Sequence, residues 1–221
     1  MSSQVTYSIV IPVYNEEGNI EVLCQSLVEL FKQIGGKYEI IFVDDGSADR
    51  SFEIIKEISG RDGAVRGMAL SRNFGHQVAL TAGLEQSLGD VVIMMDADMQ
   101  HPPALISELI KKYQEGFDIV NTVRNTTKGE GFFKRVTSKV FYKLLNSLSD
   151  VPIEPASADF RLMSRRTVNA FLKLKEKDRF TRGLISWMGF KQTKIYYDAA
   201  ARKSGESKYT FRKMFHFAVD G

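Results

Sequence analysis

The sequence predicts an α/β fold with a mostly parallel sheet and helices on both of its faces. Short apolar runs alternate with segments of helical period through the first 123 residues, and polar clusters directly follow several of these runs. Such alternation is typical of βαβ units, in which each strand is followed by a helix that packs on the sheet. With 221 residues, 43% of them apolar, the chain can bury one substantial core.

The first half of the chain supplies the regular part of this pattern. Strands are expected where four to eight apolar or β-branched residues run together, at residues 7–13, 38–43, 65–70, 91–95 and 119–123. Helices are expected where apolar residues recur every three or four positions, at residues 20–34, 51–58, 78–88 and 104–115. Pro102 and Pro103 precede the last of these, and proline favours the first turn of a helix.

The second half is less regular. Extended segments are expected at residues 158–163 and 191–197, a loop at 202–208, and helices at 132–148, 164–174 and 211–219. Ser164 is of a residue type that caps helix N-termini. Residues 211–219 have one apolar face beside basic residues, which suits a helix at a membrane interface and equally a helix docked on the core.

Charge is unevenly distributed along the chain. Residues 1–123 contain 9 Lys/Arg and 18 Asp/Glu, whereas residues 124–221 contain 21 and 9. An acidic half suits a metal site, and a basic half suits phosphate, nucleic acid or an acidic membrane surface, although a solvated basic face explains the same counts. The single cysteine, Cys24, allows no internal disulfide and favours a reducing compartment and a buried packing role.

Neither a signal peptide nor a membrane span is expected within these residues. The N-terminus lacks a basic region before its short apolar run, and no stretch approaches about 18 uninterrupted apolar residues.

The most informative feature is the pair Asp96 and Asp98, directly behind the apolar run 91–95. Two carboxylates separated by one residue at the end of a buried strand can turn toward one hard cation, such as Mg²⁺ or Mn²⁺, which keeps open positions for phosphate oxygens. Open α/β sheets bind ligands beyond the carboxyl ends of their strands, which is where this pair lies. Solvated acids at the start of a turn are the alternative.

Three further polar clusters follow predicted strands, at residues 14–17 (YNEE), 44–47 (DDGS) and 71–75 (SRNFG). Each alone is ordinary turn chemistry. Because all four clusters follow strands, they are expected to gather along one edge of the sheet, where a nucleotide site would need them.

These segments closely resemble the family 2 inverting glycosyltransferases of the GT-A fold, which contains a Rossmann-like sheet. The likeness is closest to the polyprenyl-phosphate glycosyltransferases, the group that includes dolichol-phosphate mannose synthase and bacterial undecaprenyl-phosphate glucosyltransferases. It runs from about residue 7 to residue 210. The segments SRNFGHQ, DADMQHPP, ADFRLM and RKSGESKY indicate this narrower group.

The resemblance implies a role for individual residues. Those implied for the nucleotide base and ribose are Pro12, Tyr14, Glu16 and Asp44. Those implied for the rest of the donor, including a loop that closes over the diphosphate, are Asp45, Arg72, Asp96, Ala97, Arg202, Ser207 and Lys208. Metal ligation falls to Asp96, Asp98 and Gln100, an oxygen-only set that suits Mg²⁺ or Mn²⁺ and disfavours zinc.

On the acceptor side, Arg124 and Arg135 resemble the residues that bind the lipid phosphate, although Asn125 follows Arg124 where many relatives have a second arginine close by. Asp159 matches the acidic residue of the family and, with Asp98, is the expected catalytic residue. A carboxylate there could act as a general base. Because a phosphate monoester is largely ionised near pH 7, with a second pKa of about 6, an orienting role is expected instead.

Some of these residues also have purely structural explanations. Asp159 could be a buried acid paired with Arg161 or Arg165. His76 and His101 are expected to have surface or packing roles, and Trp187 is expected to lie in the core rather than to stack on a sugar.

The resemblance predicts a metal-dependent enzyme that transfers a hexose with inversion from a nucleotide sugar, UDP-linked rather than GDP-linked, to polyprenyl phosphate at the cytoplasmic face of the plasma membrane. One alternative keeps the fold but uses a sugar or protein hydroxyl as acceptor, in which case Asp159→Asn should abolish turnover. Another makes the chain a non-enzymatic module that binds a nucleotide sugar or RNA. The set of motifs argues against that module, so no nucleic-acid partner is expected.

The expected domain organisation is a catalytic domain over residues 1–210, followed by the start of an amphipathic juxtamembrane helix over residues 211–221. Family members of this group usually continue into transmembrane helices, so the given chain is expected to be truncated before them. The alternative is that this member works as a peripheral enzyme. Association of copies, if it occurs, would run through the transmembrane helices.

Overall fold

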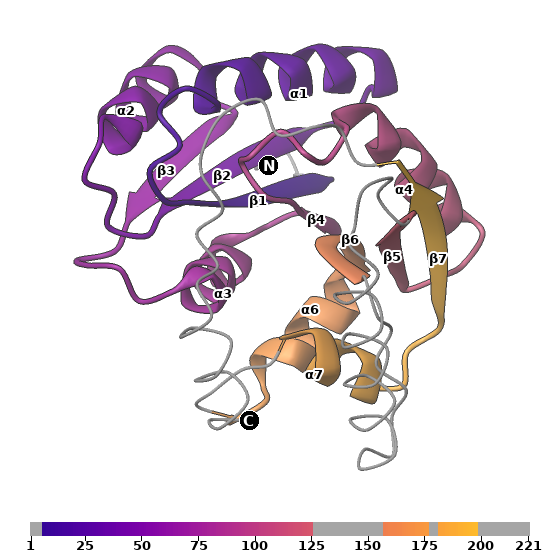
Figure 1. The fold of residues 1–221 in the computed structure, drawn as a ribbon. Helices are drawn as coiled ribbons and strands as arrows, with labels where there is room; N and C mark the ends of the chain where they lie inside the picture. The colour runs from indigo at the N-terminus through magenta and orange to yellow at the C-terminus, as the bar shows by residue number, and fades with distance from the viewer. Residues whose placement is uncertain (1–5, 126–156, 177–180, 199–221) are drawn as a thin grey trace, which may run out of the picture.

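A computed structural model of the chain describes residues 6–125, 157–176 and 181–198. In chain order, its elements are β1 (Tyr7–Val13), α1 (Ile20–Ile34), β2 (Tyr38–Asp44), α2 (Ser51–Arg61), β3 (Val65–Ala69), α3 (His76–Gln86), β4 (Val91–Met94), the 3₁₀ turn η1 (Pro103–Leu105), α4 (Ile106–Gln114), β5 (Ile119–Arg124), β6 (Ser157–Ser164), α6 (Arg165–Leu172), α7 (Thr181–Trp187) and β7 (Gln192–Tyr197) (Figure 1).

The described strands form one seven-stranded sheet in the order β3-β2-β1-β4-β6-β5-β7. Strands β1 to β4 are parallel to one another, and β5 pairs in parallel with β7. Only β6, between β4 and β5, runs antiparallel to both of its partners in this sheet. The predicted mostly parallel sheet is therefore confirmed, with one reversed strand that the sequence pattern did not indicate.

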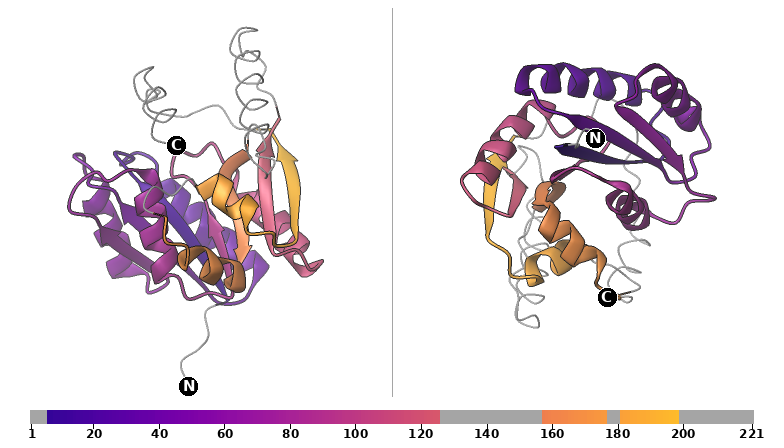
Figure 2. Two further views of the ribbon diagram at one scale, coloured as in Figure 1. Left: turned by 90° about the horizontal axis from the view of Figure 1, so that it is seen from below. Right: turned by 180° about the vertical axis from the view of Figure 1, so that it is seen from behind.

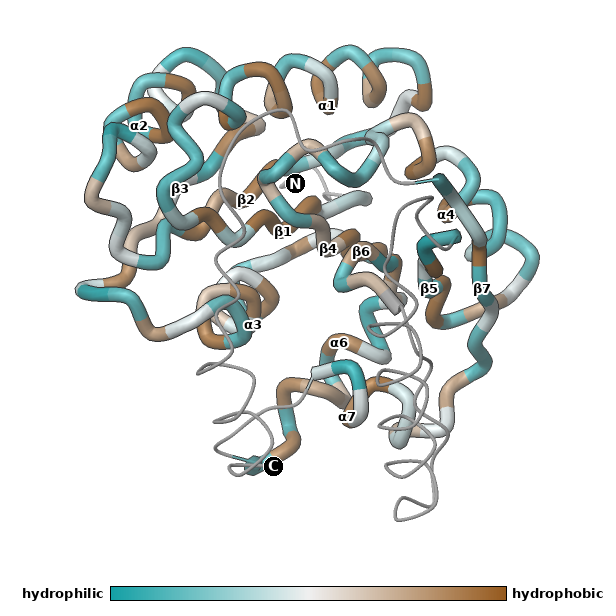
Figure 3. The backbone as a smooth tube through the Cα atoms, in the orientation of Figure 1, coloured by the Kyte–Doolittle hydropathy of each residue, from teal (hydrophilic) through white to brown (hydrophobic). Residues whose placement is uncertain are grey.

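Helices cover both faces of the sheet, as predicted. Alternate residues of a strand point to opposite faces, so Ile9 and Ile11 of β1 belong to one apolar cluster with residues of α1, α2 and α4, whereas Val10 belongs to a second cluster with residues of α3, α6 and α7. The two views of Figure 2 show these helical layers on either side of the sheet, and Figure 3 shows the apolar strands β1 and β2 between them. Strands buried on both faces read as continuous apolar runs, which is why the runs were recognisable in the sequence.

Most predicted elements are present within the described residues, with shifted ends. The helix expected at 78–88 begins at His76, and the helix expected at 104–115 is divided between η1 and α4. Ser164 directly precedes α6 but makes no side-chain cap, because its hydroxyl contacts Asp118 Oδ1 at 3.1 Å and Thr167 Oγ1 at 2.8 Å. Helix α7 was not predicted.

Three predicted segments, residues 132–148, 202–208 and 211–219, lie outside the described residues. None of the described helices is long and apolar enough to cross a membrane.

The predicted buried position of Cys24 is confirmed, and it leads to a test. Burial, with smaller contributions from the charges of Asp62 and Glu21, raises the pKa of this thiol from 9.0 to about 11. A rise of two units lowers the thiolate fraction about 100-fold at pH 8, and only the thiolate reacts. We expect the native protein to react with a disulfide reagent such as DTNB at least about 100-fold more slowly than the urea-unfolded protein. Equal rates would contradict the buried position.

Candidate active site

The four polar clusters meet at one edge of the sheet. Because β1, β2, β3 and β4 are parallel, the loops that follow them leave the sheet on the same side. The reversed strand β6 brings its first residues, including Asp159, to the edge where β4 ends. Arg124 and Tyr197, the last residues of β5 and β7, lie at this edge too. The reversal therefore adds a second set of side chains to the predicted edge.

The loops after β1 and β2 are joined by reciprocal hydrogen bonds. The backbone amide of Asn15 donates to Ser47 Oγ at 2.9 Å, and the amide of Ala48 donates to Asn15 Oδ1 at 2.8 Å. The amide of Glu16 donates to Ser51 Oγ at 2.9 Å. Asn15 has a φ of 54°, a left-handed conformation that asparagine tolerates better than most residues. These bonds make the two loops one wall of the predicted donor site.

Asp44 and Asp45, which follow β2, have different surroundings. Asp45 accepts hydrogen bonds from the amides of Phe74 at 2.8 Å and Gly75 at 2.9 Å, so both of its oxygens hold the third loop in place. Asp44 Oδ2 accepts from the amide of Ser47 at 3.1 Å. Asp44 Oδ1 is buried, and no described residue hydrogen-bonds to it. A buried acceptor without a partner is costly, so this atom is suited to an N–H group of a ligand.

Gly46 is the point of closest approach between the second and third loops. Its φ is +69°, and a Cβ at this position would lie 2.5 Å from the carbonyl carbon of Arg72 and 2.7 Å from the amide nitrogen of Asn73. We expect Gly46→Ala to lower the free energy of unfolding by about 1–3 kcal/mol, because backbone atoms must move apart and the new side chain is strained. Urea unfolding measures this change.

Gly63→Ala is the matched control, because a Cβ at Gly63 would meet nothing within 4 Å. We expect it to change the unfolding free energy by no more than about 0.5 kcal/mol. Equal effects at the two glycines would contradict the close approach at Gly46.

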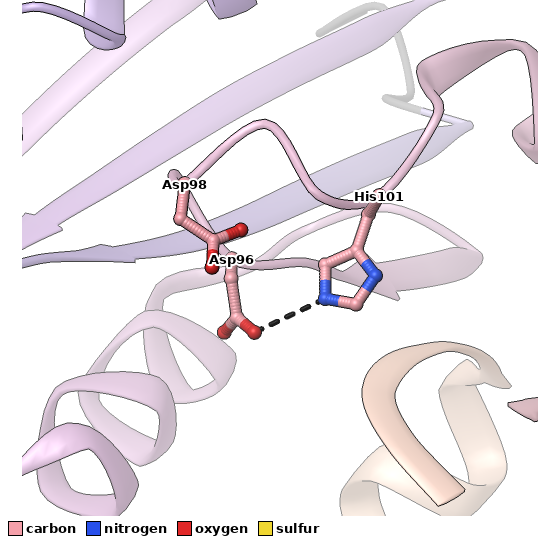
Figure 4. Close-up of side chains that lie close together, drawn as sticks. All are labelled: Asp96, Asp98 and His101. Carbon is pink, nitrogen blue, oxygen red and sulfur yellow. Dashed lines mark hydrogen bonds and ion pairs between the residues drawn. The ribbon is translucent and has the colours of Figure 1, made fainter. Parts of the chain in front are cut away.

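Asp96, Asp98 and His101 form a group that could hold a metal ion (Figure 4). One ligand atom from each lies within 4.8 Å of the others. His101 Nε2 is 3.1 Å from Asp96 Oδ2. The amide of Gln100 donates to Asp98 Oδ1 at 3.1 Å. Met99, between the two, has a φ of 60°, which bends the backbone back toward the group.

The chemistry of this donor set fits a divalent cation. Two carboxylates and a neutral imidazole nitrogen suit Mn²⁺ well, whereas Mg²⁺ prefers oxygen ligands. The predicted ligands Asp96 and Asp98 lie together as expected, and ligation by Gln100 stays a prediction. The sequence analysis missed His101 in this group. With a nitrogen in the set, the argument from oxygen-only ligation against zinc no longer holds.

Asp96 is also bonded to the second histidine. His76 Nε2, at the start of α3, lies 2.8 Å from Asp96 Oδ1. Burial alone would raise the pKa of Asp96, but the hydrogen bonds and charges of His101 and His76 outweigh it and hold the pKa well below its usual value of 3.8. Burial likewise tends to lower the pKa of His76, and the bond to Asp96 reverses this and raises it. Both His76 and His101 therefore contact the acidic pair, in addition to any surface or packing role.

Asp159 is held by an arginine that the sequence analysis did not consider. Arg182 of α7 donates from Nε to Asp159 Oδ1 and from Nη2 to Oδ2, each at 2.9 Å. The buried Arg161 Nη2 lies 3.6 Å from Oδ1. Burial tends to raise the pKa of Asp159, but the bonds and charge of Arg182, with the charge of Arg161, lower it below 3.8. The alternative that Asp159 is a buried acid paired with Arg161 is thus confirmed. Arg165, the other arginine considered, instead donates to Gly89 O and Ser87 Oγ.

Arg124 is connected to the metal-site group by the hydroxyl of Tyr197. Arg124 Nε donates to the Tyr197 hydroxyl at 3.1 Å, and this hydroxyl is 2.7 Å from His101 Nδ1. Burial raises the pKa of Tyr197 above 10.0, and the bond and charge of Arg124 offset this only in part, so the phenol stays protonated at neutral pH.

The remaining predicted residues are distributed as follows. Pro12 and Ala97 are buried, Tyr14 and Arg72 are exposed, and the Arg72 guanidinium lies 4.1 Å from the centre of the Phe74 ring. Arg135, Arg202, Ser207 and Lys208 lie outside the described residues. The prediction that Trp187 lies in the core is wrong, because its side chain is 61% exposed at the end of α7. The short apolar run around it belongs to a helix that buries only its other side, including Ile185.

Three residues at this edge of the sheet were not predicted from the sequence to belong to the site, and the reason is the same for all three. His101, Arg182 and Tyr197 come from a loop, an unpredicted helix and a strand end, and only the pairing of the strands brings them to the edge. The position of His101, three residues after Asp98, was the one available signal for it.

A family model described as glycosyl transferase family 2 matches residues 8–172. The uncharacterized glycosyltransferase YkcC of Bacillus subtilis is 48% identical over 221 residues, which cover 100% of this chain and 68% of that protein. The bactoprenol glucosyl transferase of Shigella phage SfV is 39% identical over 214 residues, covering 97% of this chain and 70% of that protein. The chain spans about two thirds of the length of these relatives.

Solved structures share the fold. Glucosyl-3-phosphoglycerate synthase from Mycobacterium tuberculosis, in complex with Mn²⁺, UDP-glucose and phosphoglyceric acid, has a TM-score of 0.61 and 22% identity, covering 97% of this chain and 76% of that chain. Residues 1–349 of S. aureus TarS, in complex with UDP-GlcNAc, give a TM-score of 0.64 and 17% identity, covering 97% and 64%. With the family model matching most of its length, this chain belongs to glycosyl transferase family 2, and it is a glycosyltransferase with the GT-A fold.

Proposed function

We propose that this glycosyltransferase transfers a hexose with inversion from a UDP-sugar, UDP-glucose or a close analogue, to the phosphate of a polyprenol such as undecaprenol. A divalent cation would bind at Asp96, Asp98 and His101. The relative from Shigella phage SfV, a bactoprenol glucosyl transferase, supports both the lipid acceptor and the glucose. A protein of the same fold in complex with Mn²⁺ and UDP-glucose is consistent with the donor and the ion.

The pairing of Asp159 with Arg182 is the main observation that supports a phosphate acceptor. Both carboxylate oxygens accept hydrogen bonds from one guanidinium, each at 2.9 Å, and the pKa of Asp159 lies below 3.8. A carboxylate held in this way is a weak base for an alcohol, whose proton must be removed during attack. A phosphate monoester is already largely ionised near pH 7. The geometry therefore favours a phosphate acceptor over a hydroxyl acceptor.

The reaction needs no proton transfer from the acceptor. An oxygen of the acceptor phosphate dianion attacks the anomeric carbon from the face opposite the nucleotide. The bond from that carbon to the diphosphate oxygen breaks, and its electron pair leaves with the UDP. When bound, a divalent cation supplies charge neutralisation for the departing diphosphate.

The chain's own residues would bind and orient the two substrates. Asp44 Oδ1, which is buried and has no hydrogen-bond partner among the described residues, would accept an N–H of the uracil base. Arg124 would hold the acceptor phosphate through charge-assisted hydrogen bonds. Asp159, fixed by Arg182, would orient the acceptor or a neighbouring arginine rather than take up its proton.

Several parts of the proposal rest on residues outside the described ranges. Arg135 would add to the acceptor-phosphate contacts, and Arg202, Ser207 and Lys208 would close over the donor diphosphate and exclude water. Residues 1–210 would form the catalytic domain, and residues 211–221 would begin a juxtamembrane helix. With a lipid acceptor and such a helix, the proposed reaction would take place at the cytoplasmic face of the plasma membrane, next to its anionic surface.

A transfer assay with the full chain tests the proposal. The reaction would contain undecaprenyl phosphate in detergent and one of a panel of UDP- and GDP-sugars, with Mn²⁺, with Mg²⁺, or with EDTA. We expect a glycolipid from one UDP-hexose, formed only with a divalent cation and identified by mass spectrometry. Proton NMR of the product would give the anomeric configuration, which we expect to be opposite to that of the donor.

A parallel reaction would offer soluble saccharides and a peptide in place of the lipid. Transfer to these acceptors, with no glycolipid, would contradict the phosphate acceptor and favour a hydroxyl acceptor. Glycolipid formation that is unaffected by EDTA would contradict the proposed metal dependence and leave the acceptor assignment intact.

A further inference from the structure

Tyr197 joins two parts of the active site that come from different elements. In the parallel pairing of β5 and β7, Tyr197 is the register partner of Arg124. Its hydroxyl receives a hydrogen bond from Arg124 Nε at 3.1 Å and lies 2.7 Å from His101 Nδ1. One buried phenol therefore holds both the proposed acceptor-phosphate arginine and the histidine of the metal-site group.

His101 continues this connection to the acidic pair. Its side chain is fully buried, and its Nε2 is 3.1 Å from Asp96 Oδ2 and 3.5 Å from Nη2 of Arg124. The nitrogen that would ligate a cation is thus the same nitrogen that Arg124 approaches. A cation bound to Nε2 would lie close to the guanidinium of Arg124, and the two positive charges would repel each other.

Packing alone does not explain why His101 and Tyr197 are polar residues. The rings of His101 and Tyr197 lie against Phe160, with centroids 5.1 and 6.4 Å from its own, so apolar rings would fill the same space. Burying an imidazole and a phenol is costly unless each polar atom finds a partner. Here His101 contacts Asp96 and Tyr197, and Tyr197 contacts His101 and Arg124, which indicates a role in positioning these residues.

We propose that Tyr197 and His101 couple the two ligand sites, so that a divalent cation at Asp96, Asp98 and His101 and a phosphate monoester at Arg124 strengthen each other's binding. A cation on His101 Nε2 turns the Arg124 guanidinium away from this nitrogen and toward the acceptor, while Tyr197 keeps the arginine anchored at Nε. An anion that draws Arg124 outward moves its positive charge away from Nε2 and so lowers the repulsion that a cation would meet there. Linkage makes the effect equal in both directions. This inference rests on the proposed role of Arg124 in binding the acceptor phosphate.

The coupling can be measured without a donor and without turnover. Free Mn²⁺ would be titrated by electron paramagnetic resonance against the full chain, with and without saturating farnesyl phosphate, a protein-free blank correcting for Mn²⁺ held by the phosphate itself. We expect farnesyl phosphate to tighten Mn²⁺ binding about 5-fold or more in the wild-type protein. Farnesol, which lacks the phosphate, should leave it unchanged.

Tyr197→Phe is the decisive variant, because it removes the hydroxyl and keeps the ring. We expect each ligand alone to bind within about 3-fold of wild type while the coupling factor falls to about 1. Tyr196→Phe is the matched control, since Tyr196 is 59% exposed, and it should keep the wild-type coupling. His101→Ala should weaken Mn²⁺ binding alone by about 10-fold or more. Thermal unfolding of each variant checks that it is folded.

The outcomes separate this inference from the proposed function. If both ligands bind wild-type protein but do not affect each other, or if Tyr197→Phe keeps the full coupling, the inference is wrong and the lipid-phosphate acceptor stands. If farnesyl phosphate does not bind at all, both are overturned. A merely structural role for Tyr197 would lower the unfolding temperature and leave the coupling factor unchanged.

Discussion

Replacing Asp98 with asparagine should lower kcat/KM at least about 10³-fold, which corresponds to about 4 kcal/mol of transition-state stabilisation. Asp98 belongs to the group whose ligand atoms lie within 4.8 Å of one another. The change keeps the shape of the side chain but replaces a charged oxygen ligand with a neutral amide. Both the affinity for the cation and the neutralisation of the leaving diphosphate should therefore decrease. Steady-state kinetics at saturating Mn²⁺ and a titration of Mn²⁺ binding measure the two effects.

Glu57→Gln is a matched control for this variant, because it makes the same kind of change at an exposed acid of α2, whose ion pair with Arg61 at 3.3 Å lies on the helix surface. It should leave both the kinetics and the Mn²⁺ affinity unchanged. Asp98 is partly exposed, so its replacement should shift the unfolding temperature little. Wild-type turnover and metal affinity in Asp98→Asn would contradict the metal site.

Replacing Asp159 with asparagine should lower the free energy of unfolding by about 3–5 kcal/mol at neutral pH. The reason is Arg161, whose side chain is 1% exposed and whose Nη2 lies 3.6 Å from the Asp159 carboxylate. Its Nε has no hydrogen-bond partner among the described residues, and burial lowers its pKa from 12.5 to about 10 although the charge of Asp159 opposes this. Removing the negative charge leaves a buried guanidinium without its compensation. Chemical denaturation measures the loss.

The pH dependence of this loss follows from the direction of the pKa shift. Because the folded-state pKa of Asp159 lies below 3.8, its contribution to stability is present above that value and is lost as the pH falls through the lowered pKa. The difference between wild type and Asp159→Asn should therefore be constant from about pH 5 to 8 and shrink below about pH 4.

A double variant separates stability from catalysis. Adding Arg161→Met to Asp159→Asn should restore most of the stability, because an apolar side chain of similar volume needs no countercharge. With a phosphate acceptor, the stabilised double variant should keep measurable transfer, since no proton must be removed. Complete loss of transfer in a stable, folded double variant would favour a hydroxyl acceptor with Asp159 as its base. An unchanged stability in Asp159→Asn would show that Arg161 does not depend on this charge.

The parts of the fold that could be predicted from sequence are those with a local signal. Strands β1, β2 and β4 are buried on both faces and therefore consist almost entirely of apolar residues. Helix α1 shows the regular spacing of a helix with one buried side. Helix α7 escaped prediction because it is only about two turns long and its residues show a mixed pattern, and its exposed Trp187 resembled a core residue.

The acidic pair and the loops after β1 to β3 were recognisable for a similar reason. Each cluster directly follows an apolar strand, and parallel strands place their following loops at the same edge. Asp45 shows the limit of this reasoning. The sequence placed it at the edge, but the structure shows that both of its oxygens hold the amides of Phe74 and Gly75.

The sequence by itself determined the α/β class, the family and the acidic pair, because apolar runs, strand-end clusters and motifs are short-range features. Only the tertiary structure decided which side chains surround that pair. The reversed strand β6 and the outer strand β7 bring Asp159 and Tyr197 from late in the chain to the edge where β4 ends. Arg182, His76 and His101 then find their partners across 20 residues or more, or within a bent loop. Such contacts depend on strand order and direction, which no local pattern of residues encodes.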